Sequence, residues 1–193
     1  MVKLLDRNKR AGEVSAQARP QVKGIRRRKA GDLAMCGRLL EVVHYDARYP
    51  ALRPEPPRAW LEHPSVHDAW VCERVGRILG HVAVSDVARD SLSALRWRET
   101  TERSSSDLMA VSRFFVRPTA REQGIGTALL DLAVTEIRRQ HRLPVLEMIS
   151  ARRDGFPFLT SRGWRLVAID AWGPKNQDLY ICRYAAPREG AAS

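Results

Sequence analysis

Two glycines lie where an apolar strand is about to become a helix. Residues 117–126 read RPTAREQGIG and follow the apolar run 114–116. The start of a helix leaves four backbone N–H groups without partners and carries roughly half a positive charge, so it attracts anions. Gly124 and Gly126 would let a bulky anion approach those groups without meeting a Cβ. The stretch therefore predicts a binding site for a phosphate-bearing ligand.

Three phosphate-binding signatures carry glycines in a similar arrangement. A P-loop needs Lys followed by Ser or Thr after its last glycine, and Thr127-Ala128 does not supply that pair. The dinucleotide fingerprint needs a small third residue where this chain has Leu129, although Glu147 lies about where its ribose-binding acid is expected. The third signature, Arg/Gln-x-x-Gly-x-Gly/Ala after a strand that ends Val-x-Pro, fits residues 116–126 throughout.

The elements that must position this loop follow from the apolar periodicity. Over 124–140 apolar residues recur at helical spacing, and the apolar run 144–149 follows as a strand. A strand, a helix and a second strand in this order predict a right-handed βαβ crossover. Asp32 precedes the apolar-periodic segment 33–43 and is expected to cap a helix there.

Shorter elements are expected on either side of this unit. Residues 70–72 and 78–84 are rich in β-forming residues, and Gly76 between them predicts an antiparallel hairpin. The polar, serine-rich stretch 86–107 predicts an exposed loop with a short helix near 92–95. Further strands are expected at 25–28, from 108, at 165–169 and at 179–184, with helical turns at 58–62 and 156–161.

With this signature and this order of elements, the chain resembles the GNAT superfamily of acyl-CoA-dependent N-acyltransferases. The stretch FPFLTSRGWRLV is similar to the family's helix-to-strand segment, which commonly ends in Gly-Phe, here Gly163-Trp164. The resemblance implies an α/β fold with a mixed, twisted β-sheet of about six or seven strands flanked by helices. It implies a single domain over 22–186, between a basic tail at 1–21 and a short tail at 187–193.

The resemblance also implies acetyl-CoA as the acyl donor. In the family, backbone N–H groups of the loop and helix start bind the CoA pyrophosphate, and the pantetheine arm pairs like an extra strand with the end of the preceding strand. A backbone N–H near Val116 would polarise the thioester carbonyl. Carried over to this sequence, the cofactor-binding residues are Phe114, Phe115, Val116, Arg121, Glu122, Gln123, Gly124, Ile125, Gly126 and Thr127.

The implied reaction is direct attack by a primary amine on the thioester, which needs a base for the amine and an acid for the thiolate. The family's usual tyrosine acid falls on Leu159, which cannot donate a proton, and an asparagine often found six residues earlier falls on Arg153. The strand before the glycine loop lacks the glutamate base that family members often place there. The remaining base candidates are Glu73, His81, Glu147 and Asp170.

The acceptor amine is open: a small metabolite, an antibiotic amine, a peptide N-terminus or a lysine all fit the reaction. Trp60 and Trp172, beside prolines and a glycine, are the candidates for the acceptor pocket. Because family members often pair through their sheets or C-terminal strands, a homodimer is a reasonable expectation.

The charge of the chain suggests a different class of function. The 193 residues carry a net charge of +11, and residues 1–30 hold ten Lys and Arg against Asp6 and Glu13. A nucleic-acid-associated protein that acts through this basic tail is therefore one alternative. An acyl-CoA sensor without turnover is the other, because the usual acid is missing at Leu159.

Composition excludes several other classes. Three cysteines at wide spacing suit neither a disulfide framework nor a zinc site. His63 and His67 are four residues apart, but Pro64 interrupts any helix that would align them, so no metal site is expected. No apolar run reaches the length of a membrane span and no signal peptide is recognisable, so we expect a cytoplasmic protein without a membrane partner.

Overall fold

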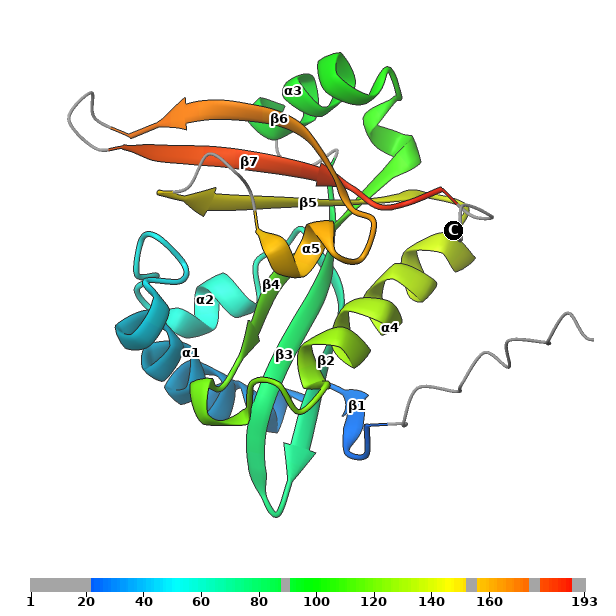
Figure 1. Ribbon diagram of the computed structural model, residues 1–193. Coiled ribbons are helices and arrows are strands. Elements are labelled where there is room, and N and C mark those ends of the chain that lie inside the picture. Colours follow the sequence, from blue (N-terminus) through cyan, green and yellow to red (C-terminus); the bar gives the residue numbers. More distant parts are fainter. Residues whose placement is uncertain (1–21, 88–90, 152–155, 174–177, 189–193) are drawn as a thin grey trace, which may run out of the picture.

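A computed structural model of the chain describes residues 22–87, 91–151, 156–173 and 178–188, and of residues 91–93 only the backbone. Seven strands form one mixed sheet flanked by helices, which confirms the expected fold (Figure 1). The strands are β1 (Ile25–Arg27), β2 (Val66–Arg74), β3 (Arg77–Asp86), β4 (Leu108–Val116), β5 (Leu143–Ser150), β6 (Arg165–Trp172) and β7 (Leu179–Ala185). The helices are α1 (Leu33–Ala47), α2 (Pro57–Leu61), α3 (Ser91–Thr101), α4 (Ile125–Arg139) and α5 (Pro157–Thr160), with 3-10 turns at Ala30–Asp32, Ser105–Asp107 and Pro118–Ala120.

The strand order is β1-β2-β3-β4-β5-β7-β6. Strands β1 to β4 pair antiparallel, β4 and β5 pair parallel, and β7 lies antiparallel between β5 and β6. The parallel pair and the intervening α4 form the predicted βαβ unit. This unit places the glycine loop, which precedes α4, at the end of β4.

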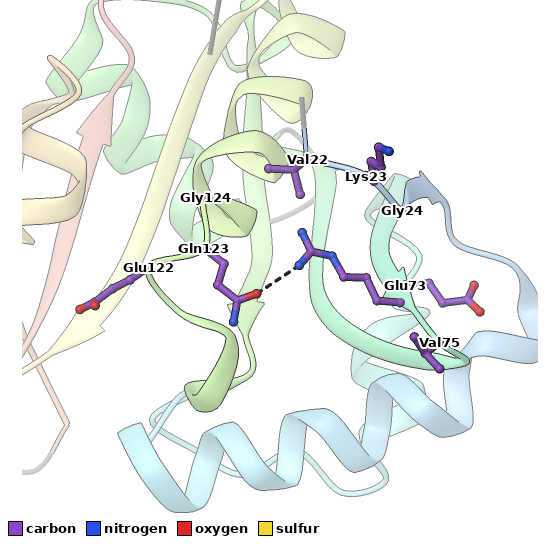
Figure 2. Close-up of a pocket in the computed structure, with 9 residues that line it drawn as sticks. Val22, Lys23, Gly24, Glu73, Val75, Glu122, Gln123 and Gly124 are labelled. Carbon is purple, nitrogen blue, oxygen red and sulfur yellow. Dashed lines mark hydrogen bonds between the residues drawn. The ribbon is translucent and has the colours of Figure 1, made fainter. Parts of the chain in front are cut away.

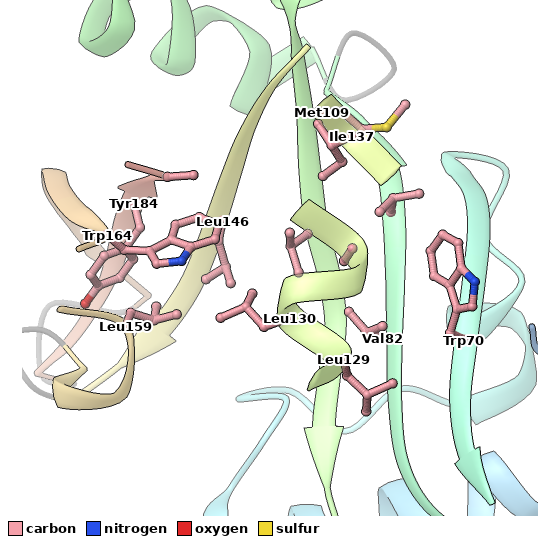
Figure 3. Packing of buried hydrophobic residues seen from close by; sticks show 14 of the residues in the cluster. Trp70, Val82, Met109, Leu129, Leu130, Ile137, Leu146, Leu159, Trp164 and Tyr184 are labelled. Atoms are coloured by element: carbon pink, nitrogen blue, oxygen red, sulfur yellow. The ribbon is translucent and has the colours of Figure 1, made fainter. Parts of the chain in front are cut away.

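Helices cover both faces of the sheet. One face packs against α4, whose apolar stripe includes Leu129, Leu130 and Ile137, and Figure 3 shows these side chains among the strands. Leu159 of α5 belongs to the same cluster. The opposite face packs against α1 and α2 beside β2 to β4, and against α3 beside β4 and β5. Successive strand residues point to opposite faces, so Val145 lies on the α3 face and Leu146 on the α4 face.

Two local expectations were wrong. The polar stretch 86–107 contains the longer helix α3, because Trp97, which is 1% exposed, anchors it against Leu108 and Val145. The Asp32 side chain does not cap α1. Its carboxylate instead accepts hydrogen bonds from the Lys29 N–H, at 2.6 Å, and from the Arg26 guanidinium, whose contact holds the pKa of Asp32 below its ordinary value.

The β2–β3 hairpin turns through two residues, Val75 and Gly76, with φ of 48° and 67°. Gly76 was expected at this turn, and two successive positive φ values belong to the tight hairpin turn that matches strand twist. Among the described helices, none is long and apolar enough to cross a membrane.

Candidate functional site

A cleft opens where β4 and β5 separate. Their parallel ladder runs from Leu108 beside Leu143 to Val111 beside Leu146, whereas β4 continues to Val116 and β5 to Ser150. A cavity of about 630 Å³ lies at this separation, and its walls come from both faces of the sheet. The end of α1 and the following residues 48–49 line it from one face, and α4 and the α5 region line it from the other.

A β-bulge turns β4 away from β5. His81 of β3 lies opposite Phe115 and Ala83 lies opposite Ser112, so two residues of β4, Arg113 and Phe114, face one residue of β3. Arg113 has a left-handed φ of 48°. A bulge bends its strand and increases the local twist, which explains why the β4–β5 ladder stops just before this point.

The backbone of Val116 has hydrogen-bonding groups free to face the cleft. The Arg117 N–H donates to the Leu79 carbonyl at 2.7 Å, so these two residues form a hydrogen-bonded pair across the β3–β4 ladder. Such pairs alternate along an antiparallel ladder, and the neighbouring pair, Val116 and Gly80, therefore turns its N–H and C=O groups outward. For Val116 the outward side is the side that β5 has left.

The glycine loop borders this cleft at the start of α4. Gly124 is the N-cap of α4 with a φ of 76°, and Glu122 is also left-handed at 64°. A Cβ on Gly126 would lie 3.5 Å from the Phe114 ring and 3.6 Å from the Phe158 ring, so it would project toward the cleft wall. The N–H groups of the first turn, at 125–127, have no partner within the helix and are available to an anion.

Most of the implied cofactor residues line the cleft. Ile125 is buried in the core beneath α4, at 1% exposure, and Gln123 faces a second cavity. The cleft also contains Arg48 and Arg162, which sequence reasoning missed. The implied residues that line it are Phe114, Phe115, Val116, Arg121, Glu122, Gly124, Gly126 and Thr127.

The second cavity, of about 1030 Å³, lies on the side of the glycine loop that faces the β2–β3 hairpin. Glu122 and Gly124 line both cavities. The Arg74 guanidinium donates to the Gln123 side-chain oxygen at 3.1 Å, and Figure 2 shows this bond between hairpin and loop. Arg121 forms an ion pair with Asp46 of α1 at 2.8 Å, so side chains from two other elements hold the loop.

The base candidates Glu73 and His81 both lie outside the cleft lining. Glu73 lines the second cavity, and its carboxylate contacts the Arg26 guanidinium at 2.6 Å. The buried imidazole of His81 lies 2.8 Å from the Arg113 carbonyl through Nδ1 and 3.1 Å from Arg28 Nη1 through Nε2. Burial lowers the pKa of His81 to about 3, so the ring is neutral at physiological pH.

Glu147 and Asp170 belong to a charge cluster on the α3 face. The buried Arg183 contacts the Glu147 carboxylate at 3.0 Å and also forms an ion pair with Asp170. Asp170 forms a second ion pair with Arg96 of α3, whose hydrogen bond is the largest cause that lowers the pKa of Asp170.

The position of the family's usual acid is filled by a core residue. Leu159 is 1% exposed and packs in the α4 cluster, and Arg153 lies outside the described residues. A different phenol lines the cleft: the ring of Tyr49, which follows α1, lies 6.4 Å from the Phe115 ring. Burial raises the pKa of Tyr49 to about 12, so its hydroxyl is protonated at neutral pH.

The two tryptophans of the expected acceptor pocket lie in different surroundings. The Trp60 ring lies 6.4 Å from the rings of both Tyr49 and Phe115, and the Arg113 guanidinium is 5.2 Å from its centroid. Trp60 thus packs against two residues that line the cleft, Tyr49 and Phe115. Trp172 ends β6, and residues 174–177 lie outside the described residues.

The histidines and cysteines make other contacts. His63 Nδ1 lies 2.9 Å from the Ser65 hydroxyl, and His67 Nε2 lies 3.3 Å from the Asp86 carboxylate. In the part of the chain that the structure describes, no three His, Cys, Asp or Glu side chains are grouped as a metal site would require. The three cysteines are all buried.

Comparisons with known proteins agree on one family. The family model described as "Acetyltransferase (GNAT) family" matches residues 38–160. A search of curated proteins gave no significant match.

Solved structures give the same fold. An N-acetyltransferase from Staphylococcus aureus Mu50 is 17% identical with a TM-score of 0.60, covering 83% of this chain and 95% of its own. The ribosomal-protein-S18-alanine N-acetyltransferase from Escherichia coli is 13% identical with a TM-score of 0.59, covering 88% and 98%. The putative acetyltransferase yncA from Salmonella typhimurium, solved with its cofactor acetyl-CoA, is 20% identical with a TM-score of 0.57, covering 88% and 97%. Since the family model spans more than half of the sequence, this chain belongs to the GNAT family of N-acetyltransferases.

Proposed function

We propose that the protein transfers the acetyl group of acetyl-CoA to a primary amine. The observation that carries this proposal is the glycine loop at the start of α4, which opens onto the cleft between β4 and β5. The first-turn N–H groups of α4 would bind the pyrophosphate, and the outward backbone groups of Val116 would pair with the pantetheine arm. The Val116 N–H would then polarise the thioester carbonyl.

The cleft has walls on both faces of the sheet, which suits a reaction between two substrates. The donor would enter beside α4 and α5, and the acceptor beside the end of α1 and Trp60. In the reaction the amine nitrogen forms a bond to the carbonyl carbon and the carbon–sulfur bond breaks. The amine loses one proton and the thiolate gains one.

For the proton that the thiolate gains, we propose Tyr49 as the donor in place of the missing tyrosine at Leu159. Its side chain lines the cleft beside Phe115, and its raised pKa keeps the proton on the hydroxyl until a strong acceptor forms nearby. We do not assign the base for the amine to Glu73, His81 or Glu147, because their side chains contact arginines and, for His81, a backbone carbonyl. We propose that a water molecule in the cleft accepts the amine proton, either alone or as a bridge to one of these groups.

Calorimetric titration with acetyl-CoA tests the donor site. Micromolar binding is expected for the wild type, and Gly126→Glu should abolish it, since the new carboxylate would fill the cleft and repel the pyrophosphate. Gly31→Glu is the matched control: a Cβ there meets no atom within 4 Å, so binding should persist. Absence of binding by the folded wild type would refute the proposal.

Turnover separates the proposed enzyme from the two alternatives. Thiol release from acetyl-CoA should rise above hydrolysis for at least one member of a panel of small amines, peptides and lysine-containing substrates. Binding without release across that panel would favour the acyl-CoA sensor. Salt-sensitive binding of nucleic acid that disappears on removal of residues 1–21, with no CoA binding, would favour the tail-based alternative. The cytoplasmic location and the homodimer stay predictions.

A further inference from the structure

Arg162 is held against the first turn of α4 by contacts from two elements. It lies between α5 and Gly163, and its Nη2 donates to the Thr127 hydroxyl at 2.6 Å. Its Nη1 donates to the Phe158 carbonyl at 2.8 Å, and the guanidinium lies 3.9 Å from the centroid of the Phe158 ring. Because Thr127 is the third residue of α4, these contacts fix a positive charge at the helix start.

The charge of Arg162 is not neutralised by an acidic side chain within the described residues. Its hydrogen bonds go to the hydroxyls of Thr127 and Ser161 and to the Phe158 carbonyl, and its Nε is buried without a hydrogen-bond partner. Arg121, the arginine of the family signature, differs because it is paired with Asp46 at 2.8 Å. Arg162 is thus a rigidly held, uncompensated cation in the cleft.

A guanidinium in this position complements the helix start. The first turn of α4 contains no acidic residue, so its unpaired N–H groups and Arg162 act on the same space. Gly126 keeps that space open, since its missing Cβ would point toward the Phe114 and Phe158 rings. A doubly charged phosphate ester that reaches the loop can accept hydrogen bonds from the helix N–H groups and from the arginine fork together.

We propose that Arg162 binds the pyrophosphate of CoA and makes the site selective for CoA over phosphate-free pantetheine thioesters. This inference rests on the proposed function, because it assigns a ligand to the cleft of the acetyl-CoA site. In this proposal the main ionic contact to the pyrophosphate comes from Arg162, which contacts Thr127 of α4. Arg121, at the family's signature position, is paired with Asp46 instead.

Affinities for three ligands test the assignment. Wild type, Arg162→Gln and Arg165→Gln are titrated with CoA, with dephospho-CoA, which lacks the 3′-phosphate, and with pantetheine, which lacks every phosphate. Arg165→Gln is the matched control, because it removes the same charge from an exposed residue at the start of β6 that does not line the cleft. Arg162→Gln should weaken CoA and dephospho-CoA binding alike, by about 10- to 100-fold, the loss expected for charged hydrogen bonds.

Two further readouts exclude a merely structural role for Arg162. Pantetheine affinity should change less than about twofold in Arg162→Gln, and the salt dependence of CoA binding should become shallower. Arg165→Gln should keep CoA affinity within about threefold, as expected for a screened surface charge. If Arg162→Gln does not fold, Arg162→Lys retains the charge without the fork and should show a smaller loss for CoA and none for pantetheine.

The outcomes that overturn the assignment are distinct. Equal CoA affinity in wild type and Arg162→Gln would refute it while leaving the proposed function intact. A loss confined to CoA and absent with dephospho-CoA would assign Arg162 to the 3′-phosphate instead. Equal losses for all three ligands would reduce Arg162 to a structural residue. A folded wild type that binds none of the three would refute the proposed function itself.

Discussion

The buried His81 predicts a specific loss of stability in mild acid. Burial lowers the pKa of His81 to about 3 in the folded protein, whereas an exposed histidine in the unfolded chain titrates near about 6.5. Above that value both states are neutral and the group adds no pH dependence. Below about pH 6.5 the unfolded chain gains a proton that the folded protein cannot accept, so the free energy of unfolding decreases as the pH is lowered. One pH unit costs about 1.4 kcal/mol, which gives a loss of about 2 kcal/mol between pH 7.5 and pH 5.

The measurement is urea unfolding at pH 7.5, 6.5, 5.5 and 5, followed for wild type and His81→Gln. The amide of glutamine can replace both ring contacts, with the Arg113 carbonyl and with Arg28, and it does not titrate. The variant is expected to be less stable at pH 7.5 but to lose about 2 kcal/mol less than wild type on going to pH 5. Carboxylates such as Asp32, whose pKa is lowered, lose their contribution at lower pH and do not enter this window. Parallel pH profiles for the two proteins would refute the reasoning.

Three further predictions concern the turn, the core and the chemistry. Val75→Asn should raise the free energy of unfolding by about 1 kcal/mol, since Val75 is fully exposed with a φ of 48° and asparagine tolerates that conformation better; an unchanged urea midpoint would contradict this. Leu129→Ala should lower the same quantity by about 2–5 kcal/mol, because Leu129 is 0% exposed between α4 and the sheet, and a loss under 1 kcal/mol would mean that the site collapses around the cavity. With whichever amine supports turnover, Tyr49→Phe should reduce kcat by about 100-fold or more at unchanged acetyl-CoA affinity, and an unchanged kcat would assign the proton to water.

Local sequence patterns predicted the frame of the site because it is built from neighbours in the chain. The run from β4 through the glycine loop into α4 is continuous over residues 108–139, so its apolar spacing, its turn glycines and the resemblance all concern one segment. The cleft beside it arises from the bulge at Arg113 and the early end of the β4–β5 ladder, and neither leaves a periodic signal in the sequence.

Contacts between distant segments were beyond prediction from a single sequence. Tyr49, from the end of α1, and Arg162, from the turn after α5, reach the cleft from segments more than a hundred residues apart. The arginine contacts of Glu73 and Glu147 depend on strand register. The apolar pattern specifies which face of a strand is buried, but it does not specify which charged residues of neighbouring strands meet. The helix α3 was underestimated for the same reason, because the burial of Trp97 is tertiary and its surrounding residues are polar.

The place of β7 between β5 and β6 has a consequence for synthesis on the ribosome. The antiparallel pairings among β1 to β4 all lie within residues 25–116, so this half can pair while translation continues. On its other edge β5 needs β7, and β6 has β7 as its partner strand, so neither can complete its hydrogen bonds until residues 179–185 have left the exit tunnel. One edge of β5 therefore stays unpaired while the residues between β5 and β7 are synthesised. During that interval, pairing with a second nascent chain competes with native folding. Chains that stop before residue 179 are expected to aggregate on release instead of accumulating as a folded fragment.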